Sequence, residues 1–276
     1  MVYRDSTTCG MLDVPGASLC YEVQGTGATL LLIPGGPADA MGFRRLADLL
    51  SDTFSVVTYD PRGLSRSIVD DPSQVITVAT QADDAYRLLN AVTSEPAHVF
   101  GSSGGAITGL ELVTKHPNSV RVLIAHEPPI IEPLPDRDAV AAQNEEVYQT
   151  YLSQGIGPAM MRFGAMAGLQ AAVPMERENP EMREAMERMG ANLGLFLGQM
   201  LREIVAYKPD ANSLSAGAIR VVVARGTTSE GQLAYRTATA LADLLGVEPV
   251  QFPGDHGGYA AEPEVFARTL RQVLAK

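Results

Sequence analysis

The stretch FGSSGGAITG, residues 100–109, decides the fold because it joins a strand pattern to a helix pattern through small residues. A β-rich run over 97–100 precedes it and helical spacing follows over 105–115, so the stretch predicts a turn and not a linker. Its glycines and serines fit G-x-S-x-G, in which the residues around the serine must be small and the serine adopts a strained backbone conformation. Ser103 is therefore the candidate nucleophile, and Ser102 is its neighbour. The stretch has neither the Gly-Lys-Ser/Thr ending of a phosphate-binding loop nor the G-x-G-x-x-G spacing of a dinucleotide site.

Apolar runs and helical patterns alternate on both sides of this turn. The β-rich runs cover residues 19–23, 29–33, 54–59, 97–100, 120–125, 218–223 and 247–252. The helical patterns cover residues 39–50, 77–93, 105–115, 231–245 and 262–274. This order predicts an α/β fold whose mostly parallel sheet is covered by helices on both faces. The first two runs, joined around Pro15-Gly16, are expected to form a hairpin that makes the leading edge of the sheet antiparallel.

One long region interrupts the alternation. Residues 135–213 show only helical patterns, such as 138–152 and 180–206, so we expect a helical cap inserted into a core made of 1–134 and 214–276. Eight of the eleven methionines lie in this region: Met160, Met161, Met166, Met175, Met182, Met186, Met189 and Met200. Methionine fills irregular gaps, so these side chains fit either helix packing or a deformable apolar lid over a pocket. The lid hypothesis has three candidate substrate-binding residues: Met161, Met166 and Phe196.

Composition and charge limit the partners of the chain. It has 276 residues, of which 46% are hydrophobic, enough for a sizeable core. Its formal net charge of −11 would repel a phosphate backbone or an anionic membrane surface, so we expect no nucleic-acid and no membrane partner. The sequence shows no signal peptide and no membrane-spanning run, which favours a cytoplasmic protein. Cys9 and Cys20 are expected to be reduced, and the four histidines lack zinc-ligand spacing, so we expect neither a metal nor a cofactor.

A serine nucleophile needs a base, and one of the four histidines is placed to provide it. His256 lies in FPGDHGGY, a glycine-rich loop after the last β-rich run, where a side chain can reach the carboxyl edge of the sheet. His98 begins a strand, His116 ends a helix and His126 ends a strand, positions that favour structural roles. His256 is therefore the candidate base.

Taken together, these motifs resemble those of the α/β-hydrolases over nearly the full chain. The resemblance rests on the leading hairpin, the sequences IPGG and YDPRGLSRS, the G-x-S-x-G turn, the helical cap and the histidine loop. It implies the α/β-hydrolase fold with a mostly parallel eight-stranded sheet, with Ser103 as nucleophile and His256 as base. It also implies an oxyanion hole formed by the backbone amides of Gly104 and Gly36. The loop that carries Gly36 has Pro34 where the family usually has a histidine.

The acid that orients the base has two main candidates. The commonest family position, after the seventh strand, reads VVVARGTTSEG here and offers only Glu230. After the sixth strand the chain reads VLIAHEPP, which puts Glu127 at the end of a strand adjacent to the nucleophile strand. A subset of the family uses this earlier position, and zearalenone lactone hydrolases carry a glutamate in a similar His-Glu-x-Pro setting, so the resemblance favours Glu127. The structural alternative for Glu127 is a carboxylate that caps a turn, and Asp255 is disfavoured because neighbouring side chains point apart.

The expected function is that of a serine hydrolase, an esterase or lactonase that acts on a mainly apolar small molecule through an acyl-enzyme on Ser103. An aminopeptidase, a perhydrolase or a carbon–carbon hydrolase with the same triad stays open, as does a catalytically idle ligand-binding member of the fold. The aminopeptidase is kept open by acidic residues of the cap, namely Glu145, Glu146, Glu176 and Glu178. Asp60 and Arg62 are expected to pair or to hold backbone carbonyls in a turn. The expected partner is a small-molecule substrate, and the chain is compatible with a homodimer.

Overall fold

The β-rich runs of the sequence form one mixed sheet. A computed structural model describes residues 7–168, 180–216 and 219–276. Its strands are β1 (Thr8–Val14), β2 (Ala17–Gln24), β3 (Ala28–Ile33), β4 (Phe54–Tyr59), β5 (Ile68–Val69), β6 (Ala97–Ser102), β7 (Val120–His126), β8 (Arg220–Gly226) and β9 (Val250–Phe252). They lie in the order β1-β2-β4-β3-β6-β7-β8-β9, and the short β5 pairs with β2. The expected sheet of eight strands is therefore confirmed, with the two-residue β5 as an addition at its edge.

The antiparallel leading edge and the parallel core follow the prediction, but the hairpin joins β2 to β1, which was not among the expected runs, and not to β3. β1 and β2 form an antiparallel hairpin that closes at Val14 opposite Ala17, and Gly16 in its turn has φ of 78°. β2 also runs antiparallel to β4, whereas every neighbouring pair from β4 through β3, β6, β7 and β8 to β9 is parallel. Cys9 and Cys20 lie on the two strands of the hairpin, and both thiols are free.

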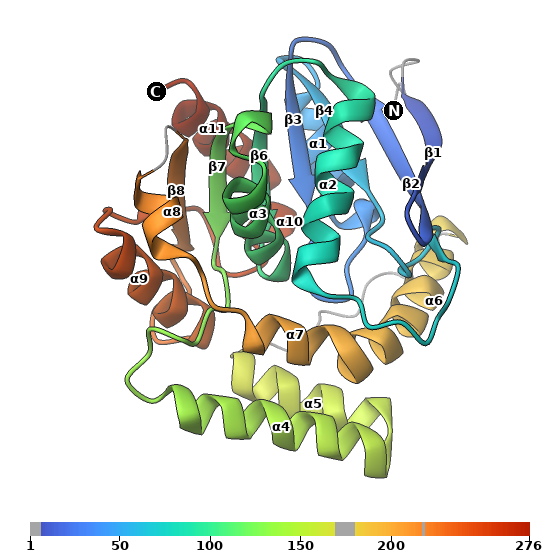
Figure 1. Ribbon diagram of the computed structural model, residues 1–276, viewed down its shortest axis with the longest axis vertical. Helices are drawn as coiled ribbons and strands as arrows, with labels where there is room; N and C mark the ends of the chain where they lie inside the picture. Colours follow the sequence, from blue (N-terminus) through green and yellow to red (C-terminus); the bar gives the residue numbers. More distant parts are fainter. Residues whose placement is uncertain (1–6, 169–179, 217–218) are drawn as a thin grey trace.

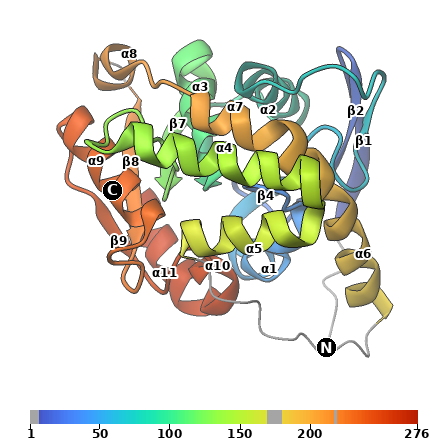
Figure 2. The same ribbon diagram turned by 90° about the horizontal axis from the view of Figure 1, so that it is seen from below.

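Helices cover both faces of the sheet, because its central strands are apolar on both sides. In β3, Leu31 packs into one hydrophobic cluster and its neighbour Leu30 packs into the other. The first cluster includes residues of α2 (Val78–Val92), α3 (Gly104–Lys115) and α9 (Leu233–Leu245). The second includes residues of α1 (Arg44–Leu50) and α11 (Pro263–Leu274). Figure 2 shows the sheet between α2 and α3 on one side and α1 and α11 on the other.

Short helical segments complete the core. Four of them lie in the connections between the longer elements: η1 (Ala40–Phe43), η2 (Pro117–Ser119), α8 (Ala211–Ala216) and α10 (Gly258–Ala261).

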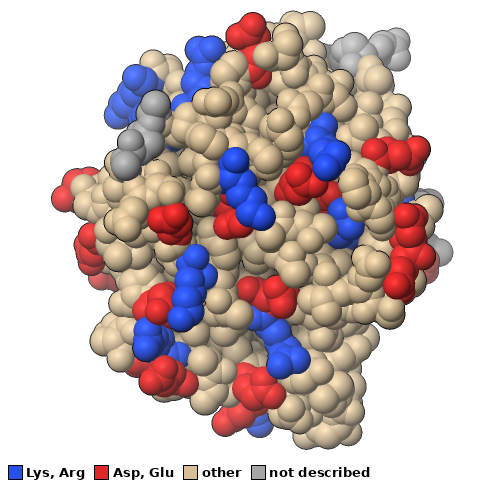
Figure 3. Space-filling view, viewed as in Figure 1, with Lys and Arg blue, Asp and Glu red and all other residues tan. Residues whose placement is uncertain are grey.

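On the face of the molecule drawn in Figure 3, Lys and Arg side chains lie next to Asp and Glu side chains and do not gather into one patch. Some of these neighbouring charges form ion pairs at the surface. For example, Arg236 on α9 lies 2.6 Å from Asp136.

The interrupting region forms helices, as predicted. They are α4 (Arg137–Gln154), α5 (Ile156–Ala167), α6 (Pro180–Leu195), a π-helical turn η3 (Phe196–Met200) and α7 (Leu201–Ala206), which we call the cap helices. Between β7 and β8 the described residues contain no strand. Figure 1 shows α4, α5 and α7 beyond the end of the sheet at which the parallel strands finish. The proposed division into a core of 1–134 and 214–276 and a cap of 135–213 stays a prediction.

Candidate active site

Ser103 stands on the tight turn that its sequence motif predicts. It follows β6 directly and precedes α3, and its backbone has φ of 56° and ψ of −124°, a conformation that costs an L-residue about 1–3 kcal/mol. A Cβ atom on Gly101 would lie 2.4 Å from the carbonyl oxygen of Gly105, and one on Gly105 would lie 2.1 Å from that of Ile33. Both positions therefore require glycine, which confirms that the residues around the serine must be small.

Glu127 ends the neighbouring strand in the same way. In the register of β6 and β7, Ser102 is opposite His126, so Ser103 and Glu127 each come one residue after the last paired position. Glu127 also has a positive φ, 48°. The Ser103 N–H donates to the carbonyl oxygen of His126 at 2.9 Å, and the Glu127 N–H donates to that of Ala224 on β8 at 2.9 Å. These bonds bring the serine and the glutamate to one edge of the sheet.

The structure pairs Glu127 with His256. The Oε2 atom of Glu127 lies 2.7 Å from Nδ1 of His256, and its Oε1 atom accepts from the Gly226 N–H at 2.8 Å. The Glu127 side chain is fully buried, whereas that of His256 is one-fifth exposed. Burial alone would raise the pKa of Glu127, but the bond from His256, the charges of His126 and His256 and the Gly226 amide together lower it to about 2. Glu127 is thus an ionised carboxylate placed to accept a proton carried on Nδ1 of His256, the arrangement that a base acting through Nε2 would need.

His126 lies against this pair without joining it. Its ring centroid is 6.4 Å from that of His256, and the ring is completely buried. Burial lowers the pKa of His126 to about 4, against the opposing effect of the Glu127 charge. The ring is therefore neutral at neutral pH, and its charge affects the pKa of Glu127 only in the acid range in which both groups titrate.

The other acid candidates lie elsewhere. Glu230 is exposed at the surface after β8. Asp255 accepts from the N–H of Gly257 at 2.8 Å, so it stabilises the turn of the histidine loop. The Nδ1 atom of His256 is already engaged by Glu127.

Two backbone amides lie together next to Ser103. Gly104 begins α3, and a Cβ atom on it would lie 3.4 Å from the backbone nitrogen of Gly36. Gly35, which precedes that nitrogen, packs so closely on the turn that a Cβ atom there would lie 2.7 Å from the Cβ of Ser103. The structure thus brings the two predicted oxyanion-hole residues, Gly36 and Gly104, to the nucleophile turn, and two adjacent N–H donors suit an oxygen that gains negative charge.

The comparison with known sequences decides the family. The model of the alpha/beta hydrolase fold family matches residues 28–168. The uncharacterised hydrolase YraK of Bacillus subtilis is 35% identical to this chain over 273 residues, which cover 97% of this chain and 96% of YraK. The chain belongs to the alpha/beta hydrolase fold family.

Further relatives of this α/β-hydrolase extend the likeness. A zearalenone hydrolase of Bionectria ochroleuca is 25% identical over 268 residues, which cover 95% of each chain. Among solved structures, a thermophilic esterase from Thermogutta terrifontis superposes with a TM-score of 0.75 at 21% identity, over 97% of this chain and 98% of its own. The predicted resemblance to α/β-hydrolases, and within them to zearalenone hydrolases, is confirmed.

The predicted substrate-binding residues of this α/β-hydrolase occupy different environments. Phe196 is buried, and a Cβ atom on Gly36 would lie 3.7 Å from its ring, so it is close to the oxyanion amides. Met166 is half-buried on α5. Met161 is 78% exposed, because α5 turns its buried face, which includes Ala159, to the protein, so the structure offers no support for a pocket-lining role of Met161. Of the other cap methionines, Met175 lies outside the described residues.

Ile204 is a site residue that the sequence reasoning missed. It lies on α7, and a Cβ atom on Gly104 would come within 2.8 Å of its Cδ1 atom. Together with Phe196 it places apolar groups next to Gly104 and Gly36. Phe196, Met200 and Ile204 recur every four residues and are all buried, so the signal was present as one apolar face of a helix.

Of the two alternatives expected for the YDPRGLSRS segment, Asp60 and Arg62 do not pair, whereas Arg62 does hold a backbone carbonyl of a turn, that of Pro15. Arg62 is buried and donates to both carboxylate oxygens of Asp84 on α2, with Nε to Oδ2 at 2.6 Å, and also to the carbonyl oxygen of Pro15. Asp60 instead accepts from Arg66, with Nε to Oδ2 at 2.7 Å. Asp84 was not anticipated because it lies 22 residues away on a helix that packs over the loop.

Within residues 7–168, 180–216 and 219–276, no three His, Cys, Asp or Glu side chains gather in a way that could hold a metal ion. The helices in these ranges also include none with the length and hydropathy of a membrane-spanning segment.

Proposed function

We propose that this α/β-hydrolase cleaves a carboxylic ester or lactone of a mainly apolar small molecule through an acyl-enzyme on Ser103. The observation that carries the proposal is the buried Glu127–His256 hydrogen bond of 2.7 Å at the sheet edge where Ser103 follows β6. An ionised carboxylate in this position fixes the imidazole tautomer and stabilises the imidazolium that forms during attack.

The proposed reaction uses only residues of this chain and water. Ser103 Oγ attacks the substrate carbonyl carbon while Nε2 of His256 takes its proton, and the carbonyl oxygen becomes an anion that accepts from the N–H groups of Gly36 and Gly104. The tetrahedral intermediate collapses, the ester oxygen leaves with the proton from His256, and the acyl group stays on Ser103. Water, deprotonated by His256, then attacks the acyl group, and Ser103 regains its proton. With a lactone the leaving oxygen remains tethered, so the product is a hydroxy acid.

The choice of an apolar ester or lactone over an amine-bearing peptide has three supports. Phe196 and Ile204 place apolar groups against the oxyanion amides. Glu145 and Glu146, two of the acids that kept an aminopeptidase open, are exposed and lie within 4.0 Å of Arg202 and 2.6 Å of Arg162, respectively. Glu176 and Glu178 lie outside the described residues. The relatives named zearalenone hydrolase and esterase support the same class of reaction.

The proposal is tested by Ser103→Ala with p-nitrophenyl butyrate as substrate and Ser102→Ala as the matched control. Ser103→Ala is expected to lose nearly all turnover, as subtilisin loses about a millionfold without its nucleophile, while Ser102→Ala stays active. A fluorophosphonate probe should label the wild-type chain on Ser103 only, as shown by peptide mass spectrometry. Full turnover in Ser103→Ala, or equal loss in both variants, would overturn the assignment.

A further inference from the structure

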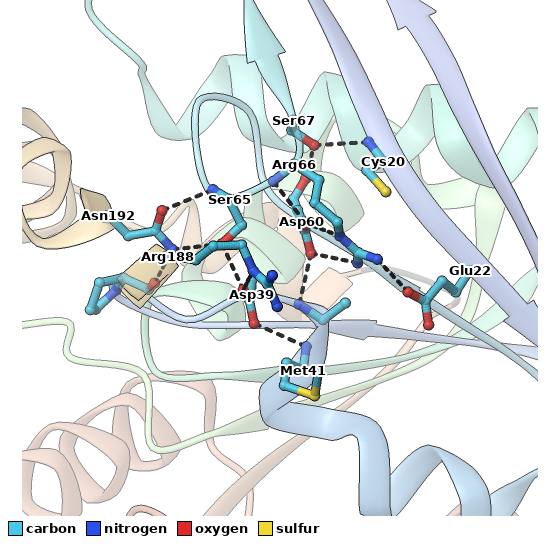
Figure 4. Close-up of polar contacts among 12 residues, drawn as sticks. Cys20, Glu22, Asp39, Met41, Asp60, Ser65, Arg66, Ser67, Arg188 and Asn192 are labelled. Atoms are coloured by element: carbon cyan, nitrogen blue, oxygen red, sulfur yellow. Dashed lines mark hydrogen bonds and ion pairs between the residues drawn. The ribbon is translucent and has the colours of Figure 1, made fainter. Parts of the chain in front are cut away.

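Helix α6 carries a buried asparagine that reaches two loops of the core at once. Asn192 is 3% exposed. Its amide nitrogen donates to the Pro37 carbonyl oxygen and to the Ser65 hydroxyl, both at 2.9 Å, and its amide oxygen accepts from the Ser65 N–H at 2.8 Å. Figure 4 shows the side chain between these two loops, with both of its polar atoms engaged.

Ser65 makes its half of this contact in a backbone conformation that favours glycine. Its φ is 51°, a left-handed conformation that is strained for a residue with a Cβ atom. Its hydroxyl donates to Oδ2 of Asp39 at 2.6 Å and accepts from Asn192. Glycine at this position would remove the strain, but it would also remove the hydroxyl contacts with Asp39 and Asn192. The serine hydroxyl therefore connects the loops to α6.

The two loops are themselves fixed to the sheet. Asp60, directly after β4, accepts from the Ala40 N–H with Oδ1 at 3.1 Å and from Arg66 with Oδ2 at 2.7 Å. A second side chain of α6 also contacts the core, because Nε of Arg188 lies 3.8 Å from Oδ2 of Asp39. The link between α6 and the core is therefore a set of contacts and not one isolated bond (Figure 4).

Pro37 connects this link to the oxyanion amides. The Ala38 N–H donates to the Gly35 carbonyl oxygen at 3.1 Å, which closes a turn whose two central residues are Gly36 and Pro37. Asn192 thus holds the carbonyl of Pro37, the second central residue of the turn, one residue from the Gly36 amide that lies beside Gly104. We propose that Asn192 is a positioning residue, which holds this turn so that the Gly36 N–H is aimed at the oxyanion when α6 is docked on the core. This inference rests on the proposed function.

The variant Asn192→Asp separates positioning from packing. It keeps the shape of the side chain and an acceptor for the Ser65 N–H, but it removes the donor to Pro37 and places a carboxylate beside Asp39. With p-nitrophenyl butyrate, kcat should fall about 10- to 100-fold with KM changed less than about twofold, because the oxyanion contact forms in the transition state. A role in packing alone would lower the melting temperature or raise KM and leave kcat of the folded variant unchanged.

Asn144→Asp is the matched control, since Asn144 is a buried cap asparagine whose amide donates at 2.9 Å to Val140 in its own helix. Its kcat should equal that of the wild type. If Asn192→Asp does not fold, Ser65→Gly takes its place, because glycine adopts the observed φ freely; its kcat should fall about threefold at unchanged KM. Unchanged kcat in the folded variant, or an equal loss in Asn144→Asp, overturns the inference. Activity in Ser103→Ala would instead overturn the proposed function.

Discussion

Glu127→Gln removes the charge from the glutamate–histidine pair without changing the size of the side chain. The carboxylate accepts twice, from Nδ1 of His256 at 2.7 Å and from the Gly226 N–H at 2.8 Å, whereas an amide has one acceptor oxygen. If that oxygen faces Gly226, the NH2 group faces His256, and the imidazole proton moves to Nε2, the atom that must accept the proton of Ser103. If it faces His256, the Gly226 N–H is buried without an acceptor, which costs about 1–3 kcal/mol.

Both arrangements lead to measurable losses. A wrong tautomer lowers kcat by up to about ten-thousandfold in the serine-protease precedent. The pKa of Glu127, lowered from 4.5 to about 2, corresponds to about 3 kcal/mol of stability at neutral pH. The folded-state pKa is the lower one, so this stability is present above pH 4.5 and is lost as the pH falls from 4.5 towards 2. Glu127→Gln has no carboxyl group to titrate, so the difference in free energy of unfolding between wild type and variant should shrink as the pH falls through this range.

Two assays check these losses, with Glu230→Gln as the control for removing an exposed carboxylate. Turnover of p-nitrophenyl butyrate gives the kinetic effect at neutral pH, and urea unfolding at pH 7, 5, 4 and 3 gives the free energy of unfolding. We expect Glu127→Gln to be nearly inactive and about 3 kcal/mol less stable at pH 7, with convergence towards wild type at pH 3. Turnover within fivefold of wild type, together with a pH-independent stability difference, would refute the reasoning.

Three further outcomes follow from the structure. His256→Ala should lose as much turnover as Ser103→Ala, and the double variant should be little worse, because residues that act as a unit are not additive; losses that multiply in steady-state assays would contradict this. Ile204→Val should raise the ratio of kcat/KM for a butyrate ester to kcat/KM for an acetate ester about tenfold. Met161→Ala, at a 78% exposed position, should leave this ratio unchanged. Arg62→Ala should lower the free energy of unfolding by about 3–5 kcal/mol, by breaking a buried ion pair, without changing kcat of the folded fraction, as measured by urea titration and active-site labelling.

Local patterns were sufficient for the core of the fold. The β-rich run before Ser103 and the helical spacing after it predict β6, the turn and α3, because the glycines leave no other local solution. Glu127 could be placed beside the nucleophile because residues that follow neighbouring parallel strands meet at one sheet edge. These inferences use only the chain within a few residues of each site and the order of the strands.

Contacts between distant segments could not be predicted in this way. The periodicity of α5 shows an apolar helix but not which side faces the core, so Met161 was assigned to the site although it is exposed. The approach of Ile204 to Gly104 and of Asn192 to Pro37 depends on how the cap helices dock, over separations of 100 and 155 residues along the chain. Nothing in the local sequence of either partner specifies the other.

The order of the site residues along the chain determines which parts of the protein can be exchanged. Ser103 and Glu127 belong to one strand–helix–strand unit, β6–α3–β7, and all the cap helices follow Glu127. A longer, shorter or foreign cap therefore changes the path from β7 to β8 but leaves the register of Ser102 with His126 untouched. Only His256 lies beyond the insertion. The cap helices are thus candidates for exchange, and a graft that supplies its own asparagine for Pro37 should leave the proposed nucleophile and acid in place.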